Sequence, residues 1–457
     1  MSFADLLTPH GEGMRFSTIR IPPEMKWPKE LSLSRLSRHT LVQNTLSLYG
    51  VYLPNYFVPL LVIPYLARVL GAAGWGLVAF TQAFGVYLGV VVEFGFFLSA
   101  NREVARHRED RDKLGEILAG VLGARGFLSL ACTGPALAAG IWIPIFRAHP
   151  DLFWAGWFWG LVQGFSMSWF FQGLERTRLV VALETPAQFL SVAAILLFIH
   201  RPQDAWLVLV IQGSAYAIPA AVELTIAYRE VPFRLPRLRT IRDGLRLGTS
   251  MFLYRSSLEL YARGNSLILG LFVPPQMVGY YAAAEKIARA SYRSLNPITQ
   301  ALYPRLSYLI HNARDKAHRL ARMGVIFVGT GGVLLAVFIY LSAPWLIRII
   351  AGPEFLPAIP ILRILALMPA LIAFGQAYGT QWMLPLGMDR AFNSVMLLAA
   401  VLDITLALIL APRYADVGMA WVAVATEAVI AIGFYLVLRF HRLDPLRHMI
   451  RSEREAA

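Results

Sequence analysis

Apolar stretches of about 20 residues follow one another along most of the chain, and this pattern limits the fold more than any other feature. Each stretch is long enough to cross the hydrocarbon core of a bilayer as a helix. Charged residues make up only 15% of the chain, well below the roughly 25% of soluble domains. We expect an all-α, polytopic helical bundle of about twelve transmembrane helices. They are predicted at 44–67, 76–100, 114–138, 151–171, 179–199, 205–228, 247–270, 277–303, 323–346, 360–384, 391–411 and 417–438.

The connections between these stretches are too short for a soluble catalytic domain. The basic N-terminal segment lacks the apolar core of a signal peptide, so we expect a cytoplasmic tail. The predicted organisation is a tail (1–43), a six-helix lobe (44–228), a cytoplasmic linker (229–246), a second six-helix lobe (247–440) and a C-terminal tail (441–457).

The basic residues are distributed unevenly between the two sides of this topology. With both termini placed inside, the inner segments hold 30 of the 42 Lys and Arg and the outer loops hold five. This positive-inside bias predicts a multi-pass membrane protein with both termini in the cytoplasm. Because topology accounts for the net charge of +14, we expect no nucleic-acid partner.

Short matches between the two halves suggest an internal repeat. At an offset of 203 residues Gly76 corresponds to Gly279 and Gln82 to Glu285, and the Gly173–Arg176 segment resembles Gly387–Arg390 at an offset of 214. Two halves of six spans each have the same orientation, so their pseudo-twofold axis runs along the membrane normal. Coincidence between apolar segments is the alternative interpretation.

Two consecutive predicted spans carry an unusual number of charges. Lys286, Arg289 and Arg293 fall at i, i+3 and i+7 on one helix face, and YRSSLELYARG places Arg255, Glu259 and Arg263 on one face of the preceding span. Cations are costly inside a bilayer and almost always face a bundle interior or a water-filled cavity.

Five cations exceed the two carboxylates, Glu259 and Glu285, that accompany them. The excess predicts an anionic ligand, and arginine suits phosphate oxygens because it binds them in a bidentate way. For Arg255, Glu259 and Arg263 the alternative is a self-paired triad that holds helices together. Arg125, in the third span, serves equally well as a further ligand contact or as a salt-bridge partner. Replacing Arg289 or Arg293 by alanine is expected to abolish transport without unfolding the protein.

The first span contains several prolines, which bend helices, and is a candidate moving gate. Its polar-tipped side chains suit a sugar or lipid headgroup, or are ordinary interface aromatics. The gate and headgroup candidates are Tyr49, Tyr52, Asn55, Tyr56 and Pro59. Glu259 and Asp403 are candidates for ion coupling, and helix pairing is the alternative role for each. We predict no metal site, and no ATP-binding P-loop occurs in the sequence.

Several motifs resemble the Wzx-type polysaccharide flippases, of the superfamily that also contains multidrug extruders and the lipid II flippase. The similarity extends in order from about residue 40 to residue 440. The motifs are PYLARVLGAAGWG (64–76), VEFGFFLSANREVAR (92–106), WFFQGLERTR (169–178), VGYYAAAEKIARA (278–290) and PITQALYPRLSYL (297–309).

The resemblance implies two six-helix lobes around a cationic cavity, with no cofactor. It further implies alternating access, by which undecaprenyl-diphosphate-linked oligosaccharide units of O-antigen or exopolysaccharide move from the cytoplasmic to the periplasmic leaflet. In that picture Arg255, Arg263, Lys286, Arg289 and Arg293 face the diphosphate and anionic sugars. Expected partners are this lipid-linked substrate, membrane lipid and other polysaccharide-assembly proteins.

Three alternative functions remain open. A multidrug antiporter of the same superfamily would bind organic cations and is expected to carry carboxylates in its cavity. An integral-membrane glycosyltransferase or polymerase could use Asp110 and Asp112 as a metal-binding DxD pair, although these residues lie in a charged loop. A lipid II flippase would be expected to have two further spans.

Overall fold

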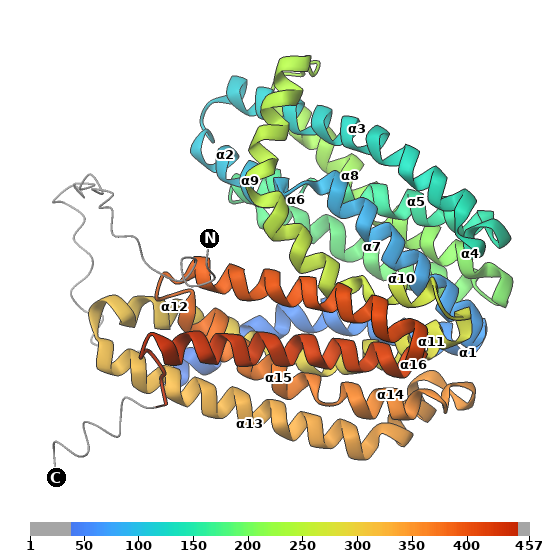
Figure 1. Cartoon of the computed structure of the whole chain (residues 1–457). Coiled ribbons are helices and arrows are strands. Elements are labelled where there is room, and N and C mark those ends of the chain that lie inside the picture. The colour runs from blue at the N-terminus through green and yellow to red at the C-terminus, as the bar shows by residue number, and fades with distance from the viewer. Residues whose placement is uncertain (1–37, 447–457) are drawn as a thin grey trace, which may run out of the picture.

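The computed structural model describes the backbone of residues 38–446 and the side chains of 62–446, except 250, 253–263, 297–298 and 300–301. Over that range the chain is helical throughout and contains no strand (Figure 1). The α-helices are α1 (Arg38–Glu93), α2 (Phe96–Arg106), α3 (Arg111–Trp142), α4 (Pro144–Ala148), α5 (Pro150–Gly164), α6 (Ser168–Gly173), α7 (Thr177–Phe198), α8 (Ala205–Glu230), α9 (Leu238–Arg263), α10 (Asn265–Gly270), α11 (Pro275–Arg293), α12 (Asn296–Asn312), α13 (Arg314–Leu346), α14 (Ala358–Leu365), α15 (Met368–Gly375) and α16 (Asp389–Phe440). Short 3₁₀ or π segments are η1 (Pro202–Asp204), η2 (Ile347–Ala351), η3 (Pro353–Phe355) and η4 (Gln376–Met383).

Seven helical segments within the described residues are long and apolar enough to cross a membrane. They confirm an all-α, multi-pass membrane protein, while the count of twelve spans stays a prediction. The long helices α1 and α16 each contain a sharp change of direction, at Gly71 and Ala415, where two predicted spans meet. Gly71 has φ 66° and ψ 178°, a conformation that glycine adopts without steric cost.

Other predicted spans are interrupted. The segments at 151–171, 247–270 and 277–303 are each divided between two helices, and α1 gives way to α2 at Phe94–Gly95. Glu93 stabilises that last break, because its carboxylate accepts hydrogen bonds from Gly95 N (3.1 Å) and Phe97 N (2.6 Å). Interrupted helices with locally satisfied backbone groups are common where a membrane protein encloses a cavity.

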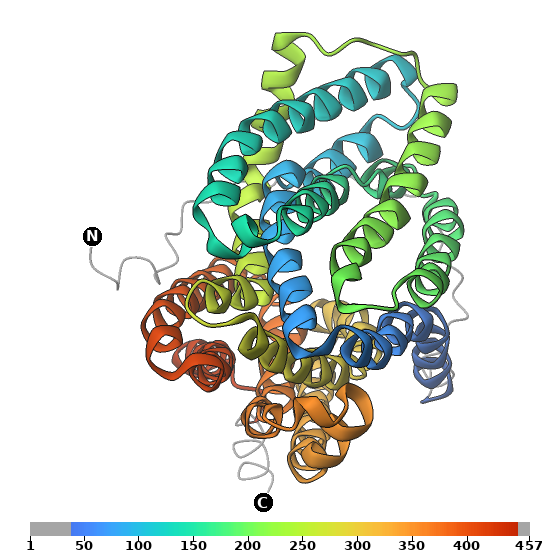
Figure 2. The same cartoon turned by 90° about the vertical axis from the view of Figure 1, so that its right-hand side faces the viewer.

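The helices form two groups that diverge from a common end (Figure 1). We call α2–α8 with the second part of α1 the N-lobe, and α10–α16 the C-lobe. Helix α9 contacts α2 and α3 of the N-lobe and α16 of the C-lobe, so it joins the two groups. Figure 2 views the molecule from the common end, with the N-lobe helices above the C-lobe helices. The predicted domain boundaries at 228 and 247 stay a prediction.

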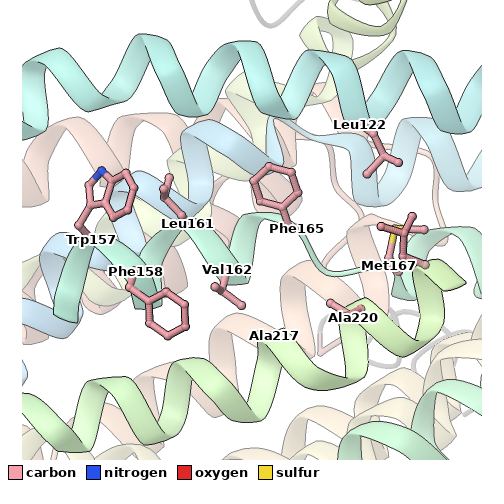
Figure 3. A pocket seen from close by; sticks show the side chains of 11 residues that line it. Leu122, Trp157, Phe158, Leu161, Val162, Phe165, Met167, Ala217 and Ala220 are labelled. Atoms are coloured by element: carbon pink, nitrogen blue, oxygen red, sulfur yellow. The ribbon is translucent and has the colours of Figure 1, made fainter. Parts of the chain in front are cut away.

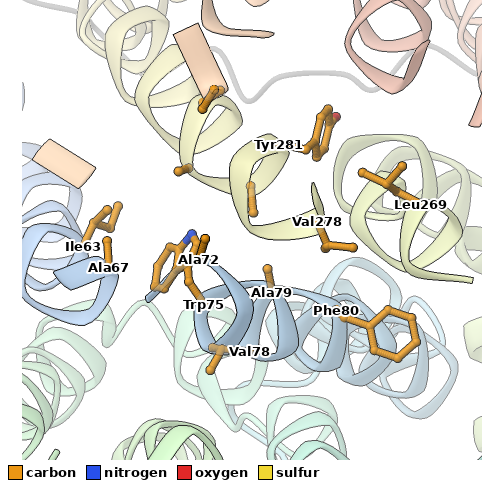
Figure 4. Packing of buried hydrophobic residues seen from close by; sticks show 14 of the residues in the cluster. Ile63, Ala67, Ala72, Trp75, Val78, Ala79, Phe80, Leu269, Val278 and Tyr281 are labelled. Atoms are coloured by element: carbon orange, nitrogen blue, oxygen red, sulfur yellow. The ribbon is translucent and has the colours of Figure 1, made fainter. Parts of the chain in front are cut away.

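At the common end, α1 and α11 cross in close contact through two glycines. A Cβ atom on Gly76 would lie 1.7 Å from the carbonyl oxygen of Pro275, and one on Gly279 would lie 2.0 Å from that of Ala72. Figure 4 shows Trp75, Val78 and Val278 beside this crossing. Gly76 and Gly279 are the pair matched at the 203-residue offset, and residues close to a pseudo-twofold axis are expected to meet in this way.

Hydrogen bonds also stabilise the common end of the two lobes. Ala72 N donates to Glu354 Oε1 at 2.9 Å, and Arg68 Nη2 donates to the carbonyl oxygen of Ile349 at 2.6 Å. Both contacts join α1 to the η2–η3 segment, which is more than 280 residues away in sequence. Helix packing and hydrogen bonds thus close this end, which we call the closed end.

Candidate functional site

A cavity of 570 Å³ lies between the two lobes. Its size falls within the roughly 300–1,000 Å³ that is typical of ligand pockets. Residues of both parts of α1 and of α5, α7 and α8 line it, and residues of α10 and α11 line it from the C-lobe. Among the lining residues, the polar ones are Gln82, Glu184, Thr185, Gln188, Ser191, Gln212, Tyr216, Ser266, Glu285, Lys286, Arg289 and Arg293.

Helix α11 brings the three predicted cations Lys286, Arg289 and Arg293 to this cavity. They lie on one face of the helix, as their spacing predicts. Arg289 is not unpaired: its Nη2 atom is 2.8 Å from Glu285 Oε1, with side chains 18% and 11% exposed. The expectation of unpaired cations is therefore wrong for Arg289. The cause is the i, i+4 spacing of Glu285 and Arg289, which favours an ion pair on a helix.

Lys286 links the two walls of the cavity. Its Nζ atom is 3.3 Å from Gln82 Oε1 and 4.1 Å from the centroid of the Trp75 ring. Gln82 in turn donates from Nε2 to Gln212 Oε1 at 2.8 Å. A chain of three side chains thus crosses from α11 through α1 to α8. The cation–π contact and the amide oxygen stabilise the ammonium group where little water reaches it.

The N-lobe wall contains a polar stripe that sequence reasoning missed. Glu184, Gln188 and Ser191 recur at i, i+4 and i+7 on α7 and line the cavity together with Thr185. The segment VALETPAQFLSVAAI contains the pattern that could have predicted this stripe. Polar residues at helical spacing in an otherwise apolar span indicate a helix face turned away from lipid.

Arg125 lies elsewhere, in the N-lobe core. Its side chain is 1% exposed and packs against the rings of Phe96 and Trp169, each 5.7 Å from its guanidinium carbon. Arg125 Nη1 donates to the carbonyl oxygen of Ser166 at 2.8 Å. Ser166 lies in the break between α5 and α6, so Arg125 satisfies a carbonyl group that the interrupted helix leaves unpaired. It is not among the residues that line the cavity.

Asp403 is buried in α16 and does not line the cavity. Thr426 Oγ1 donates to Asp403 Oδ1 at 2.9 Å, and Asn265 of α10 lies beside the carboxylate. Its Oδ2 atom has no hydrogen-bond partner among the described residues. No cluster of three or more potential metal-ligating side chains occurs in the described part of the chain.

Other predicted site residues lie outside the described side chains. Arg255, Glu259 and Arg263 belong to α9, and Tyr49, Tyr52, Asn55, Tyr56 and Pro59 belong to the first part of α1. Their roles stay predictions. The DxD-like pair has structural contacts instead: Asp110 caps α3 by accepting from Lys113 N at 2.9 Å, and Asp112 Oδ1 is 2.5 Å from Arg234 Nη2.

A second cavity, of 340 Å³, lies within the N-lobe between α3, α5 and α8 (Figure 3). Side chains such as Leu122, Phe158 and Phe165 line it, and no charged residue is among them. It therefore lacks the charged groups that a phosphate requires.

Comparison with known proteins agrees with this architecture. A family model described as "Polysaccharide biosynthesis protein" matches residues 41–310. A protein of Escherichia coli (strain K12) named "Putative O-antigen transporter" is 28% identical over 408 residues, which cover 88% of this chain and 98% of that protein. A protein of the same name from Shigella dysenteriae is 25% identical over 394 residues, 85% of this chain and 98% of its own length.

Two solved structures share the fold. The lipid II flippase MurJ in an inward closed conformation aligns with a TM-score of 0.62 at 12% identity, covering 88% of this chain and 87% of that one. An inward-facing multidrug resistance transporter of the MATE family and MOP superfamily aligns with a TM-score of 0.59 at 16% identity. The alignment covers 85% of this chain and 98% of that one. The family model matches more than half of the chain and confirms the resemblance seen in the sequence motifs: the chain belongs to the polysaccharide biosynthesis protein family.

Proposed function

We propose that this protein is a flippase that moves undecaprenyl-diphosphate-linked oligosaccharide units from the cytoplasmic to the periplasmic leaflet of the bacterial inner membrane. Both termini would lie in the cytoplasm, as the distribution of basic residues predicts. In Figure 1 the chain emerges from the described residues at the end opposite the closed end. The closed end would then face the periplasm, and the protein acts as a transporter rather than as an enzyme.

The observation that carries this proposal is the placement of Lys286, Arg289 and Arg293 on one face of α11 in a cavity between two lobes. A diphosphate needs several hydrogen-bond donors when it leaves water, and these three side chains supply them. The pairing of Arg289 with Glu285 fits this role: a guanidinium has five N–H donors, and the carboxylate fixes its orientation. The names of the relatives support an O-antigen precursor as the substrate class.

The proposed cycle is alternating access. With the closed end sealed, the headgroup enters from the cytoplasmic leaflet while its lipid tail stays in the bilayer. The diphosphate competes with Gln82 for Lys286, and this competition weakens one contact between the lobes. Opening the closed end requires separation of α1 from α11 and loss of the Glu354 contact with Ala72.

We propose the following roles for the other predicted residues in this cycle. Arg255 and Arg263 would extend the cationic surface, and the Tyr49–Pro59 region would form a gate for the headgroup. Arg125 instead holds the broken α5–α6 segment in place. Asp403, with one carboxylate oxygen lacking a partner among the described residues, and Glu259 are the candidates for the coupling ion.

The described cavity does not favour the alternative functions. A site for organic cations needs an excess of carboxylates, whereas three cations and two carboxylates line this cavity. A metal-dependent glycosyltransferase would need Asp110 and Asp112 for its metal, but a helix cap and an ion pair engage them.

The experiment that tests the proposal is headgroup translocation in proteoliposomes. Purified protein would be reconstituted with undecaprenyl-diphosphate-oligosaccharide, and an impermeant sugar-modifying enzyme would report exposure of the headgroup. We expect protein-dependent exposure that falls at least tenfold in Lys286→Gln and in Arg293→Gln. The matched control is Arg363→Gln, because Arg363 is an exposed cation of the C-lobe that packs on Tyr340 and does not line the cavity.

Three results would count against the proposal. Exposure at the rate of protein-free vesicles would exclude this cargo. Normal exposure in both cavity variants would show that the α11 cations do not bind the headgroup. An equal loss in Arg363→Gln would show that the assay responds to general damage rather than to the site.

A further inference from the structure

The connection between α8 and α9 packs closely against α3. We call residues 231–239, which run from the end of α8 into the first turn of α9, the linker segment. Figure 2 shows it at the top of the view as an extended stretch between these two helices. A Cβ atom on Gly115 of α3 would lie 2.7 Å from the carbonyl oxygen of Pro232, and one on Gly123 would lie 2.6 Å from Cβ of Pro236. The linker segment therefore has a defined position on the N-lobe.

Three large apolar side chains of the linker segment are exposed. Phe233 is 67% exposed, Leu235 is 74% exposed and Leu238 is 86% exposed. Phe233 also contacts the Tyr228 ring, with 5.1 Å between the ring centroids. Such exposure is ordinary on a helix that faces lipid, but the linker segment belongs to none of the seven described segments that are long and apolar enough to cross a membrane. A group of exposed apolar side chains outside a span indicates a surface that contacts a lipid or protein partner.

The linker segment lies at the depth where α3 is predicted to enter the membrane. Gly115 and Gly123 are eight residues apart, which corresponds to about 12 Å along the helix axis. The predicted span begins at residue 114, so the stretch from Pro232 to Pro236 runs beside its first turns. This is the boundary between lipid headgroups and acyl chains, where amphipathic segments bind.

Arginines alternate with the apolar side chains. Residues 231–239 contain Arg234, Arg237 and Arg239 and no carboxylate. Arg234 forms an ion pair with Asp112 of α3, which helps to hold the segment in place. Arg237 makes no ion pair with a described residue, and Arg239 acts only at longer range on Glu116, which has its own ion pair. The exposed surface therefore carries positive charge that matches anionic headgroups.

We propose that the linker segment is an interfacial anchor that binds anionic phospholipid on the predicted cytoplasmic side of the membrane. Phe233, Leu235 and Leu238 enter the acyl region, while Arg237 and Arg239 bind headgroup phosphates. An acidic protein surface would pair with the arginines but would give the three apolar side chains no partner, so the combination favours lipid. The anchor ties the adjacent ends of α3, α8 and α9 to one membrane surface, and it is independent of the transported cargo.

The test measures the Tm of the full-length protein in detergent during titration with phosphatidylglycerol, and separately with phosphatidylcholine of the same acyl chains. A lipid that binds the folded protein raises the Tm with increasing occupancy. In Arg237→Gln/Arg239→Gln the half-maximal concentration of phosphatidylglycerol should rise about tenfold, and that of phosphatidylcholine should stay within about twofold of wild type. The matched control is Arg147→Gln/Arg413→Gln, which removes two exposed arginines on the opposite predicted side and should change neither value.

A second variant tests the apolar half of the proposal. Leu235→Ser/Leu238→Ser should weaken the binding of both lipids about fivefold and keep the preference for phosphatidylglycerol. It should fold normally, because both side chains are exposed. Inorganic phosphate and polyglutamate serve as probes for a free anion and for an acidic protein, and neither should raise the Tm through the two arginines.

Four results would overturn the anchor. An unchanged phosphatidylglycerol value in the arginine variant would remove the headgroup contact, and an equal loss in the control would assign it to net charge alone. Unchanged lipid binding in the leucine variant would exclude insertion of the apolar side chains. A rise in Tm with phosphate or polyglutamate that disappears in Arg237→Gln/Arg239→Gln would assign the surface to a free anion or to an acidic protein instead of lipid.

Discussion

Removing the Arg289 side chain should lower stability because Glu285 loses its ionic partner, and should lower transport because the cavity loses a guanidinium. One pair of variants separates the two effects. In Arg289→Ala the Glu285 carboxylate, 11% exposed and 2.8 Å from Arg289 Nη2 in the wild type, loses its ionic partner. Tyr281 Oη remains 3.3 Å from the same Oε1 atom, so one weak hydrogen bond is left. Glu285 then remains as a nearly unsolvated charge beside the cavity.

The magnitude follows from this geometry. Breaking a buried ion pair by removing one partner costs roughly 3–5 kcal/mol. The side chains here remain 18% and 11% exposed to the cavity, so we expect about 2–4 kcal/mol. The double variant Glu285→Gln/Arg289→Gln removes both charges and keeps a polar side chain at each position, so its stability should lie within about 1 kcal/mol of wild type. The ion pair thus adds a predicted loss of stability to the expectation that Arg289→Ala abolishes transport without unfolding the protein.

The assay combines thermal unfolding of purified protein in detergent with headgroup exposure in proteoliposomes. Arg289→Ala should lower the Tm by several degrees, whereas the double variant should unfold near the wild-type temperature. Both should lose at least tenfold in transport, because neither presents a guanidinium to the diphosphate. A double variant as unstable as Arg289→Ala would refute the ion-pair argument, and a double variant that transports normally would remove Arg289 from the site.

Three further predictions concern the closed end and Asp403, a candidate for ion coupling. Gly76→Ala should lower the Tm and slow transport, at a cost of about 1–3 kcal/mol from overpacking, because its Cβ would lie 1.7 Å from the Pro275 carbonyl oxygen. The control is Gly134→Ala, whose Cβ would meet no atom within 4 Å, and equal Tm values for the two variants would contradict the close crossing. Glu354→Ala should speed hydrogen exchange of the Ala72 amide by about tenfold or more, because the amide loses its acceptor. In the control Glu354→Gln, which keeps an oxygen acceptor, the Ala72 amide should exchange at nearly the wild-type rate. Asp403→Asn should keep the Thr426 hydrogen bond but abolish any acceleration of transport by an ion gradient, and a variant that still responds to the gradient would exclude Asp403 as the coupling residue.

Much of the fold was predictable because the bilayer imposes a simple rule. A run of about 20 apolar residues must become a helix, since no water is present to satisfy its backbone. The sharp turns at Gly71 and Ala415 fall between predicted spans for the same reason. The interruptions at Phe94–Gly95 and Ser166 were not predicted, because the side chains of Glu93 and Arg125 supply the missing hydrogen bonds from within the fold.

The site was predicted less completely, because a sequence gives the face of a helix but not what that face meets. Lys286, Arg289 and Arg293 were found through their cost in lipid, and the structure brings them to one cavity. Arg125 carries the same cost, yet it stabilises a break in a neighbouring helix. Charge inside a span therefore indicates a partner, and the partner can be a carboxylate, an aromatic ring or an opened backbone as well as a ligand.

The predicted internal repeat distinguishes positions that the fold requires from positions that the proposed cargo requires. Gly76 and Gly279 have the same identity in both halves because two backbones approach there, and any side chain on either residue would collide with the other helix. The cavity faces of the same two helices differ: Gln82 corresponds to Glu285, and Ala83 corresponds to Lys286. Packing needs no such difference, since an alanine fills that position in the N-lobe. Under the proposed function, this asymmetry follows from a substrate with a charged diphosphate at one end and sugar hydroxyls at the other.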